Sequence, residues 1–479
     1  MPKLVFLWTD VVLYLIFLVL LWYGWRIKVN TNLRAQWGKV LRDPAALCSG
    51  IVLVLFTLVT AVDSVHFRRA LPPAAGAPSD ARTFYATSTE SLLDVMLIGL
   101  SQTRESNYSA PLAYLGFTKE PSERNGQPVR DHPRLKFGGA HLADPATQWL
   151  PDVLRRATAG ALAGLALAAL AWLATAWVLR ADHGGVAKAF KDIAADRTHL
   201  PLRAALLTVA VIGVLLGPVV ALMGHYHVFG TDRTGNDVLY QALKSVRTAF
   251  VIGTLATVAT LPFAVVLGIL GGYLKGWVDE VIQYLYTMLS SVPNVLLIAA
   301  CVLMVQVFLD KHPDMFETGA ERSDLKIFML CVILGLTGWA TLCRLVRGET
   351  LKLREFDFVQ AATAFGVSPA RIMARHIAPN VMHLVLITTV LSFSDLILYE
   401  AVLTYVGVGV DPSMNSFGGM INLARNEMSR DPVVWWSFAA AFGFMVTLVL
   451  AANLFADGVR DAFDPRSRNF RPRLRVAAV

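Results

Sequence analysis

Nine apolar segments dominate this chain of 479 residues, and each is long enough to cross a lipid bilayer as a helix. A hydrocarbon core of about 30 Å requires about 20 apolar residues in a row. Inside a bilayer the backbone polar groups find no water, so a spanning segment must satisfy them as a helix. The sequence therefore predicts an all-α polytopic membrane protein with about nine transmembrane helices, at residues 4–25, 45–63, 154–179, 203–223, 248–273, 284–309, 326–343, 383–408 and 433–456.

The composition agrees with a chain that lives in the lipid bilayer. Hydrophobic residues make up 55% and charged residues 16%, with a mean hydropathy of +0.52. The net charge of +8 comes from short basic runs beside apolar segments, which set membrane orientation, so we expect no nucleic acid partner. The four cysteines have no CxxC spacing and no histidine cluster, and we expect neither a disulfide framework nor a metal site.

The distribution of Lys and Arg predicts how the spans are oriented. Residues 26–44, 181–203, 344–376 and the tail from 460 are rich in Lys and Arg, whereas the alternate loops 224–244, 310–325 and 409–432 hold two apiece. The positive-inside rule places the rich set in the cytoplasm. With nine spans, we expect a periplasmic N-terminus and a cytoplasmic C-terminus in the inner membrane. The first segment is predicted to be a retained span, because its apolar run is too long for a signal peptide and its basic flank follows it.

Residues 64–152, between the second and third spans, have a different composition. A Pro/Ala/Gly-rich linker opens the segment, and Thr87 with Glu90 forms a capping-box pattern that predicts a helix at about 88–101. Alternation of the spans places this segment in the periplasm. It is either a poorly structured connection or a small folded cap, since loops of this length are usually functional or disordered.

A series of motifs occurs in order between residues 228 and 465. They are GTDRTGNDVL at 230–239, GGY at 271–273, GWVD at 276–279, RLVRGE at 344–349, RHIAPN at 375–380, Glu400 with YVGVGV at 405–410, and DGVRDAFDPR at 457–466. This half of the chain resembles the permease subunits of dipeptide, oligopeptide and nickel ABC importers of the DppC/OppC type. The resemblance implies an ABC importer type I (MetI-like) permease core. Asn236 departs from the pattern, because the family usually has arginine there.

The segment 356–382 resembles the cytoplasmic "EAA" loop of that family, which couples the permease to its ATPase. The residues that carry the resemblance are Gln360, Ala361, Ala362, Gly366 and Pro379. Gln360 stands where the family usually has glutamate, and Ala378 where it usually has leucine.

The residues of this loop also predict its shape. Ala361, Ala362 and Phe365 follow helical spacing, and Gly366 is suited to end that helix. Ser368 and Pro369 then form an N-cap and first-turn pair that opens a second short helix. Two short helices at a bend would form a knob for a groove in a soluble partner. The alternative is an ordinary amphipathic loop at the lipid headgroups.

The sequence contains no G-x-x-x-x-G-K-[ST] phosphate loop, so we expect ATP to be bound by other subunits and no cofactor in this chain. The resemblance implies two cytoplasmic ABC ATPase subunits, a second related permease and a periplasmic solute-binding protein. It implies import of a small solute, with a di- or oligopeptide as the first choice. A secondary transporter or a membrane enzyme not coupled to ATP are the alternatives. The first would show repeated interrupted spans, and the second a constellation of catalytic residues at one membrane depth.

Ionisable residues inside spans are functional candidates, because exposing one to lipid costs several kcal/mol, about 2.5–3.5 on insertion scales. Asp395 and Glu400 lie in the eighth predicted span, five residues apart and so on different helix faces. One interpretation is that they line the pathway or contact the partner permease. The other is that they make structural hydrogen bonds within the bundle. Pro293 and the pair Gly407 and Gly409 are interpreted as helix kinks or ends.

These observations predict a division of the chain. The ranges are 1–63 for N-terminal spans, 64–152 for the periplasmic region, 153–227 for additional spans, 228–465 for the permease core and 466–479 for a basic cytoplasmic tail. Two arrangements remain open for the first core span. It is either 45–63, followed by an insertion, or 203–223, preceded by added spans.

Overall fold

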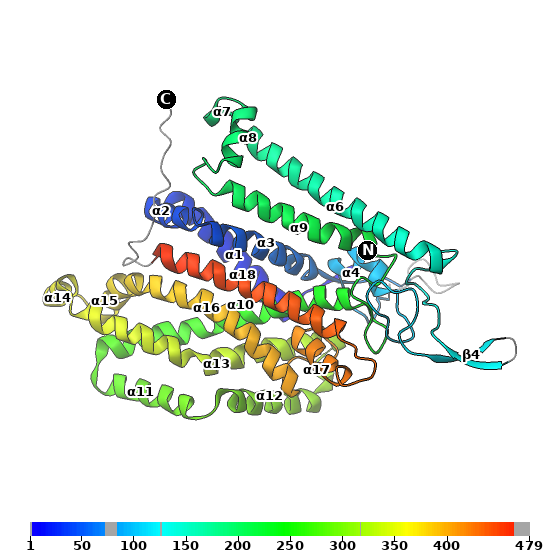
Figure 1. Cartoon of the computed structure of the whole chain (residues 1–479). Coiled ribbons are helices and arrows are strands. Elements are labelled where there is room, and N and C mark those ends of the chain that lie inside the picture. Colours follow the sequence, from blue (N-terminus) through cyan, green and yellow to red (C-terminus); the bar gives the residue numbers. More distant parts are fainter. Residues whose placement is uncertain (1, 72–83, 125–126, 317, 464–479) are drawn as a thin grey trace, which may run out of the picture.

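In the computed structural model, long helices run roughly side by side and form one elongated bundle (Figure 1). The structure describes residues 2–71, 84–124, 127–316 and 318–463, so the predicted linker after residue 71 and the basic tail lie outside the described residues. The helices are α1 (Trp8–Val29), α2 (Thr31–Val40), α3 (Pro44–Asp63), α4 (Leu92–Met96), α5 (Ile98–Ser101), α6 (Pro145–Val178), α7 (Arg180–His183), α8 (Val186–Ala194), α9 (Leu202–Leu222), α10 (Val238–Leu274), α11 (Gly276–Ser291), α12 (Asn294–Lys311), α13 (Gly319–Arg354), α14 (Asp357–Ala364), α15 (Pro369–Ile372), α16 (Ala378–Val406), α17 (Phe417–Glu427) and α18 (Trp436–Phe463).

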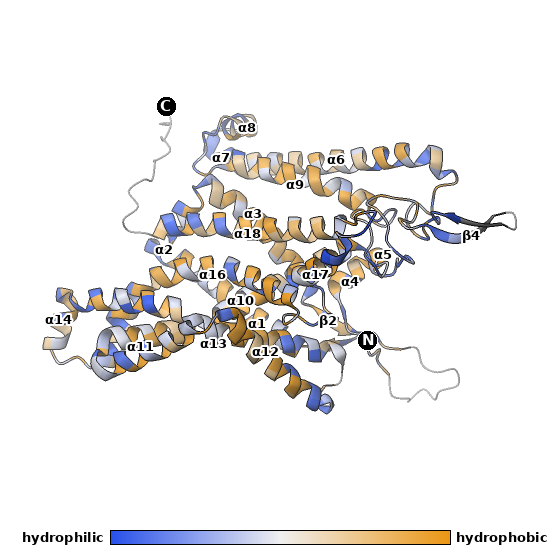
Figure 2. Ribbon diagram, turned by 60° about the horizontal axis from the view of Figure 1, so that its bottom comes forward, coloured by the Kyte–Doolittle hydropathy of each residue, from blue (hydrophilic) through white to orange (hydrophobic). Residues whose placement is uncertain are grey.

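Nine helices in the described part of the chain are long and apolar enough to cross a membrane, which confirms the predicted number. Apolar residues run along α3, α6, α9 and α18, whereas the β4 hairpin is hydrophilic (Figure 2). The prediction of one continuous helix over 284–309 is wrong. It divides into α11 and α12 at Pro293, which lacks a backbone N–H and so cannot continue the hydrogen bonds of α11.

The centre of the bundle is formed by α10, α13, α16 and α18, with α3 beside them. Helix α3 packs along both α10 and α18, whereas α9 packs on α6 and α3. This packing favours 45–63 over 203–223 as the first span of the core. Helices α6 to α9 lie at one side of the bundle, where Figure 1 shows α6 and α9 side by side.

Glycines bring α6 and α9 into backbone contact. A Cβ placed on Gly160 would lie 2.6 Å from the carbonyl carbon of Gly217, and one on Gly164 would lie 3.1 Å from the Cα of Gly213. Each helix therefore carries a small-xxx-small pair, the pattern that lets membrane helices approach closely. Without a hydrophobic force between helices in lipid, this close packing is what holds the pair together.

Helix α1 is attached to the core through buried charges. Asp10 Oδ1 lies 2.6 Å from Arg247 Nη2 of α10, and the backbone N–H of Thr9 donates to Asp324 Oδ2 of α13 at 3.1 Å. His66 Nδ1 lies 2.8 Å from Asp10 Oδ2. Buried charges persist when they are paired, so α1 has a fixed position against α10 and α13.

The described residues between 64 and 152 form a small folded cap at the end of the bundle away from α14 (Figure 1). The strands are β1 (Lys3–Val5), β2 (His66–Arg68) and β3 (Glu90–Ser91), which form one antiparallel sheet, and β4 (Glu120–Arg124) and β5 (Gln127–Asp131), which form a hairpin. The capping box predicted at Thr87 and Glu90 is wrong. Ser91 and Asp94 form it instead, because Glu90 pairs in the sheet and the helix begins at Leu92.

Candidate functional site

The segment 356–382 begins with α14, which ends at the predicted glycine. Gly366 has φ +74°, the left-handed region that favours glycine. Its N–H donates to the carbonyl of Thr363 at 3.0 Å, and the N–H of Val367 donates to the carbonyl of Ala362 at 3.1 Å. These two bonds form a Schellman motif, which turns the chain sharply after one short helix.

The second part of the segment differs from the predicted short helix. Ser368 occupies the N-cap position without a side-chain hydrogen bond, and Pro369 opens α15. The helix then continues through a π-helical turn, Met373–Ile377, into α16. The physical reason is Pro379, which has no N–H and whose ring crowds the carbonyl of Arg375. A wider turn accommodates such a residue without ending the helix.

This segment forms an elbow that is buried on one side and exposed on the other. Val359, Ile372, Ile377 and Val381 are at most 1% exposed and pack into the core formed by α10 and α13. On the outer side, Phe365 is 87% exposed. The predicted coupling residues Gln360, Ala361, Gly366 and Pro379 are also exposed, whereas Ala362 is half-buried. The elbow thus presents small and apolar groups outward from a fixed base.

An ion pair that the sequence analysis did not predict stabilises the base of the elbow. Arg347 Nε lies 2.6 Å from Asp279 Oδ1, and its Nη2 lies 2.7 Å from Asp279 Oδ2. Both residues fall in quoted motifs, but sixty-eight positions separate them, and no spacing rule reaches that far. Hydrogen bonding from Arg347 lowers the pKa of Asp279. The fork-to-fork geometry joins α13 to α11 in one orientation.

Asp395 and Glu400 lie in different surroundings, as their spacing predicts. Asp395 is exposed on the surface of α16. Glu400 is fully buried, and its Oε1 accepts a hydrogen bond from Thr404 Oγ1 at 2.8 Å. Thr404 Oγ1 in turn accepts from the N–H of Val410 at 3.0 Å. Glu400 therefore holds the end of α16, where Gly407 with φ +89° terminates the helix.

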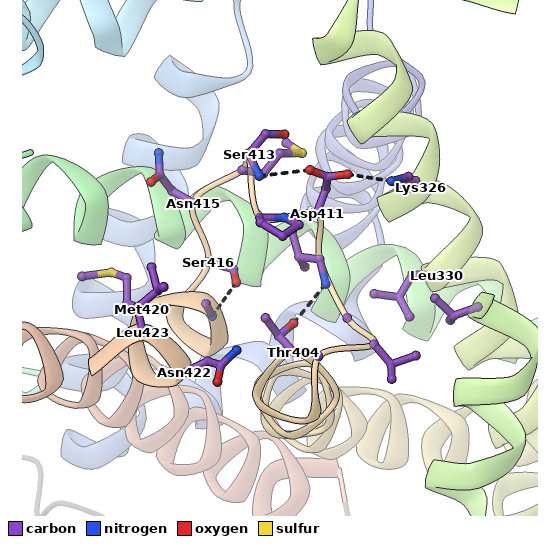
Figure 3. Close-up of a pocket in the computed structure, with 18 of the residues that line it drawn as sticks. Lys326, Leu330, Thr404, Asp411, Ser413, Asn415, Ser416, Met420, Asn422 and Leu423 are labelled. Carbon is purple, nitrogen blue, oxygen red and sulfur yellow. Dashed lines mark hydrogen bonds and ion pairs between the residues drawn. The ribbon is translucent and has the colours of Figure 1, made fainter. Parts of the chain in front are cut away.

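A cavity of about 560 Å³ lies beside α17, near the end of the bundle away from α14 (Figure 1). Figure 3 shows residues that line it. Its walls come from the loop before α10, from α12 and α13, and from residues 404–423. Uncharged polar groups such as Asn415 and Asn422 alternate there with apolar ones such as Leu330 and Leu423. A mixed lining of this kind suits a solute with both amide and apolar groups.

Within the described part of the chain, histidines near the cap pair with carboxylates. Among the described residues, no group of three or more His, Cys, Asp or Glu side chains is arranged to hold a metal ion. The imidazole of His227 lies between two carboxylates. Its Nδ1 is 2.7 Å from Asp237 Oδ2, and its Nε2 is 3.4 Å from Glu105 Oε1. These side chains connect the cap to the start of α10.

Part of this chain is similar to known proteins. Residues 264–469 match the family described as binding-protein-dependent transport system inner membrane component. The oligopeptide transport system permease protein OppC of Mycobacterium tuberculosis (strain ATCC 25618 / H37Rv) is 32% identical over 248 residues, covering 52% of this chain and 79% of that protein. OppC of Escherichia coli (strain K12) is 32% identical over 245 residues, covering 51% and 74%. The inward-facing MetNI methionine ABC transporter matches with 15% identity and a TM-score of 0.35, covering 47% of this chain and 96% of that one.

A helical bundle with an exposed elbow at one end and a polar cavity toward the other has the architecture of a membrane transport component. The chain belongs to the family of OppC-like, binding-protein-dependent permeases of ABC importers. It is a multi-pass inner-membrane subunit that works with ATPase and solute-binding partners, and its relatives are transport components rather than enzymes.

Proposed function

We propose that this chain is one of two related permeases that import a di- or oligopeptide, and that two cytoplasmic ATPases drive it by binding the elbow at 356–382. ATP is bound by those partners, and this chain holds no cofactor. The observation that carries the proposal is the elbow itself, whose outer side is exposed and whose base packs into the core. Force applied to such an elbow reaches α10, α13 and α16 directly.

The orientation in this proposal places α14 in the cytoplasm and the cap in the periplasm. Helices α2, α7, α8 and α14 lie at the same end of the bundle (Figure 1). These are the regions that the sequence marks as rich in Lys and Arg, and the positive-inside rule puts them in the cytoplasm. The periplasmic binding protein would then deliver the solute at the end that carries the cap and the cavity.

The proposal also assigns the two acidic residues of α16 and the class of solute. Asp395 is exposed on a spanning helix, where contact with lipid is unfavourable, so we assign it to the pathway or to the second permease. We assign Glu400 to a hydrogen bond inside this chain, because it is buried against Thr404. The solute class rests on the OppC relatives and on the mixed lining of the cavity.

The variant Gly366→Leu tests the elbow. A leucine at φ +74° costs about 1–2 kcal/mol in backbone strain and places bulk on the exposed side. We expect the purified complex to lose its ATPase subunits and membrane vesicles to lose peptide uptake, with normal amounts of permease in the membrane.

Gly348→Leu is the matched control. Gly348 lies within α13, and no atom lies within 4 Å of the position its Cβ would take, so this variant should keep both ATPase binding and uptake. If Gly366→Leu retains both properties at wild-type membrane levels, the elbow is not the coupling element.

A further inference from the structure

An ion pair joins two walls of the cavity. Lys326 Nζ of α13 lies 2.7 Å from Asp411 Oδ2, in the segment that follows α16 (Figure 3). Their side chains are 19% and 18% exposed, so bulk water reaches them only in part. Ser323 and Ser413 make a second contact between the same walls, with their Oγ atoms 3.0 Å apart. Residues 411–413 are thereby held against the first turns of α13.

In the described part of the chain, Lys326 is the one cationic side chain that lines this cavity. The other acidic side chain there, Asp232, already accepts hydrogen bonds from the backbone N–H groups of Thr234 and Asn236 and from Gln241 Nε2. Asp232 therefore stabilises its own loop. The remaining polar groups of the lining are uncharged, so an anionic group that enters the cavity has a single charged partner to bind.

We propose that Lys326 binds the carboxylate of the imported solute, which displaces Asp411. The inference rests on the proposed peptide import. Removing a partner from a shielded ammonium is costly, whereas a solute carboxylate that replaces Asp411 keeps the ammonium paired. Asp411 loses its cation in the exchange, which offsets part of the gain and suits a site that must release its solute. Asp411 keeps its bond from the N–H of Ser413 at 3.0 Å after the exchange.

The exchange also changes what holds the cavity wall. Once Asp411 leaves Lys326, residues 411–413 remain attached to α13 through Ser323 and to α16 through the bond from Val410 N–H to Thr404. Helix α16 begins inside the elbow, where it continues from α15 and the π-helical turn. Binding of a carboxylate thus weakens one contact of a segment that is anchored on the helix leading to the elbow.

The test measures peptide affinity of the full permease complex in lipid nanodiscs, by titrating its thermal stability with trialanine and with trialanine amide. In the wild type we expect trialanine to bind about tenfold more tightly, the size of one charge-assisted hydrogen bond. Lys326→Gln should bring the two affinities together. Lys311→Gln removes the same charge at the end of α12, outside the cavity lining, and should behave as the wild type.

A second variant guards against simple misfolding. Asp411→Asn removes the internal competitor, so its preference for trialanine should exceed that of the wild type. An amidated tripeptide that carries a glutamate side chain separates the two sources of carboxylate. Tight binding of it assigns the site to any carboxylate, and weak binding assigns it to the peptide C-terminus.

Equal affinities in the wild type, or an unchanged preference in Lys326→Gln, would overturn the inference. Peptide uptake by wild-type vesicles with the binding protein tests the proposed function separately. If the vesicles take up peptide but the complex shows no preference for a carboxylate, only the role of Lys326 is rejected. If the vesicles take up no peptide, peptide import is rejected as well.

Discussion

Arg247 shows how a single residue can attach a span to the core. Its side chain is 5% exposed, and its Nη2 lies 2.6 Å from Asp10 Oδ1 on α1 and 3.9 Å from Asp324 Oδ1 on α13. Breaking a buried ion pair leaves an uncompensated charge, which is far more costly than losing a surface pair. Arg247 is therefore a main contact that fixes α1 against α10 and α13, together with the bonds from Thr9 to Asp324 and from His66 to Asp10.

We predict that Arg247→Met lowers the free energy of unfolding by about 3–5 kcal/mol, because the buried carboxylates of Asp10 and Asp324 lose the arginine cation and keep only His66 and Thr9 as partners. Thermal unfolding of the detergent-purified protein measures the loss. Arg203→Met, at an exposed position of α9, should change stability by less than about 0.5 kcal/mol. A loss below about 1 kcal/mol in Arg247→Met would mean that His66 and Thr9 are sufficient partners for Asp10 and Asp324.

At the scale of elements, the paired helices α6 and α9 depend on the absence of side chains at their contact. Gly160 and Gly164 meet Gly217 and Gly213 backbone to backbone. The outward faces of both helices are rich in exposed apolar residues, which suits contact with lipid. Packing between the two helices, rather than burial of apolar surface, sets their separation.

Gly164→Leu should force the two helices apart and lower stability by about 1–3 kcal/mol, the usual cost of overpacking. The melting temperature in detergent reports this loss. Gly443→Leu serves as the comparison, because Gly443 lies in α18 with no atom within 4 Å of its Cβ position. Equal melting temperatures for the two variants would show that α6 and α9 do not need this close contact.

Elements also show where local patterns predict well and where they do not. The helix end at Gly366 follows from a residue that tolerates positive φ, and the break at Pro293 from a missing N–H. Both effects act within one turn of the chain. The π-helical turn before Pro379 was not predicted, because helix propensity does not say whether a helix widens or ends at a proline when tertiary contacts hold both sides.

At the scale of the whole molecule, the cap is joined to the core through a buried cluster of charges. Glu105 accepts from the backbone N–H groups of Lys136, Phe137 and Gly138, and its own N–H donates to the carbonyl of Gly235. Burial alone would lower the pKa of His227, but hydrogen bonds and charges from Asp237 and Glu105 raise it to about 9. Burial would raise the pKa of Glu105, but bonds from His227 and the backbone lower it to about 2.

These shifts predict a window of maximal stability. A raised histidine pKa stabilises the fold below its ordinary value of 6.5, and this contribution is lost as the pH rises through about 9. A lowered glutamate pKa stabilises the fold above 4.5, and this contribution is lost as the pH falls toward about 2. The contact between the cap and the core should therefore be most stable between about pH 4.5 and 6.5.

The melting temperature of the detergent-purified protein, measured from pH 5.5 to 9.5, should fall on the alkaline side. The variant His227→Gln cannot be protonated, so it should lack the part of this decline that comes from the cluster. Parallel curves for the wild type and the variant would show that His227 is not charged in the folded protein.

The sequence alone determined the class of this protein and the place of its exposed elbow. Apolar length dictates the number of spans, because the cost of burying unpaired backbone groups in lipid leaves helices as the stable choice. The positions of Gly366 and Pro293 dictate where helices end, since those effects are local. The ordered motifs between residues 228 and 465 carried the family resemblance.

The tertiary structure decided what depends on distant contacts. It placed α3 rather than α9 beside α10, paired Arg247 with Asp10 across 237 positions, and brought Lys326 to Asp411 across a cavity. It also separated exposed Asp395 from buried Glu400. Charge pairing and close packing depend on distances in space, and a pattern that repeats every three or four residues carries no information about them.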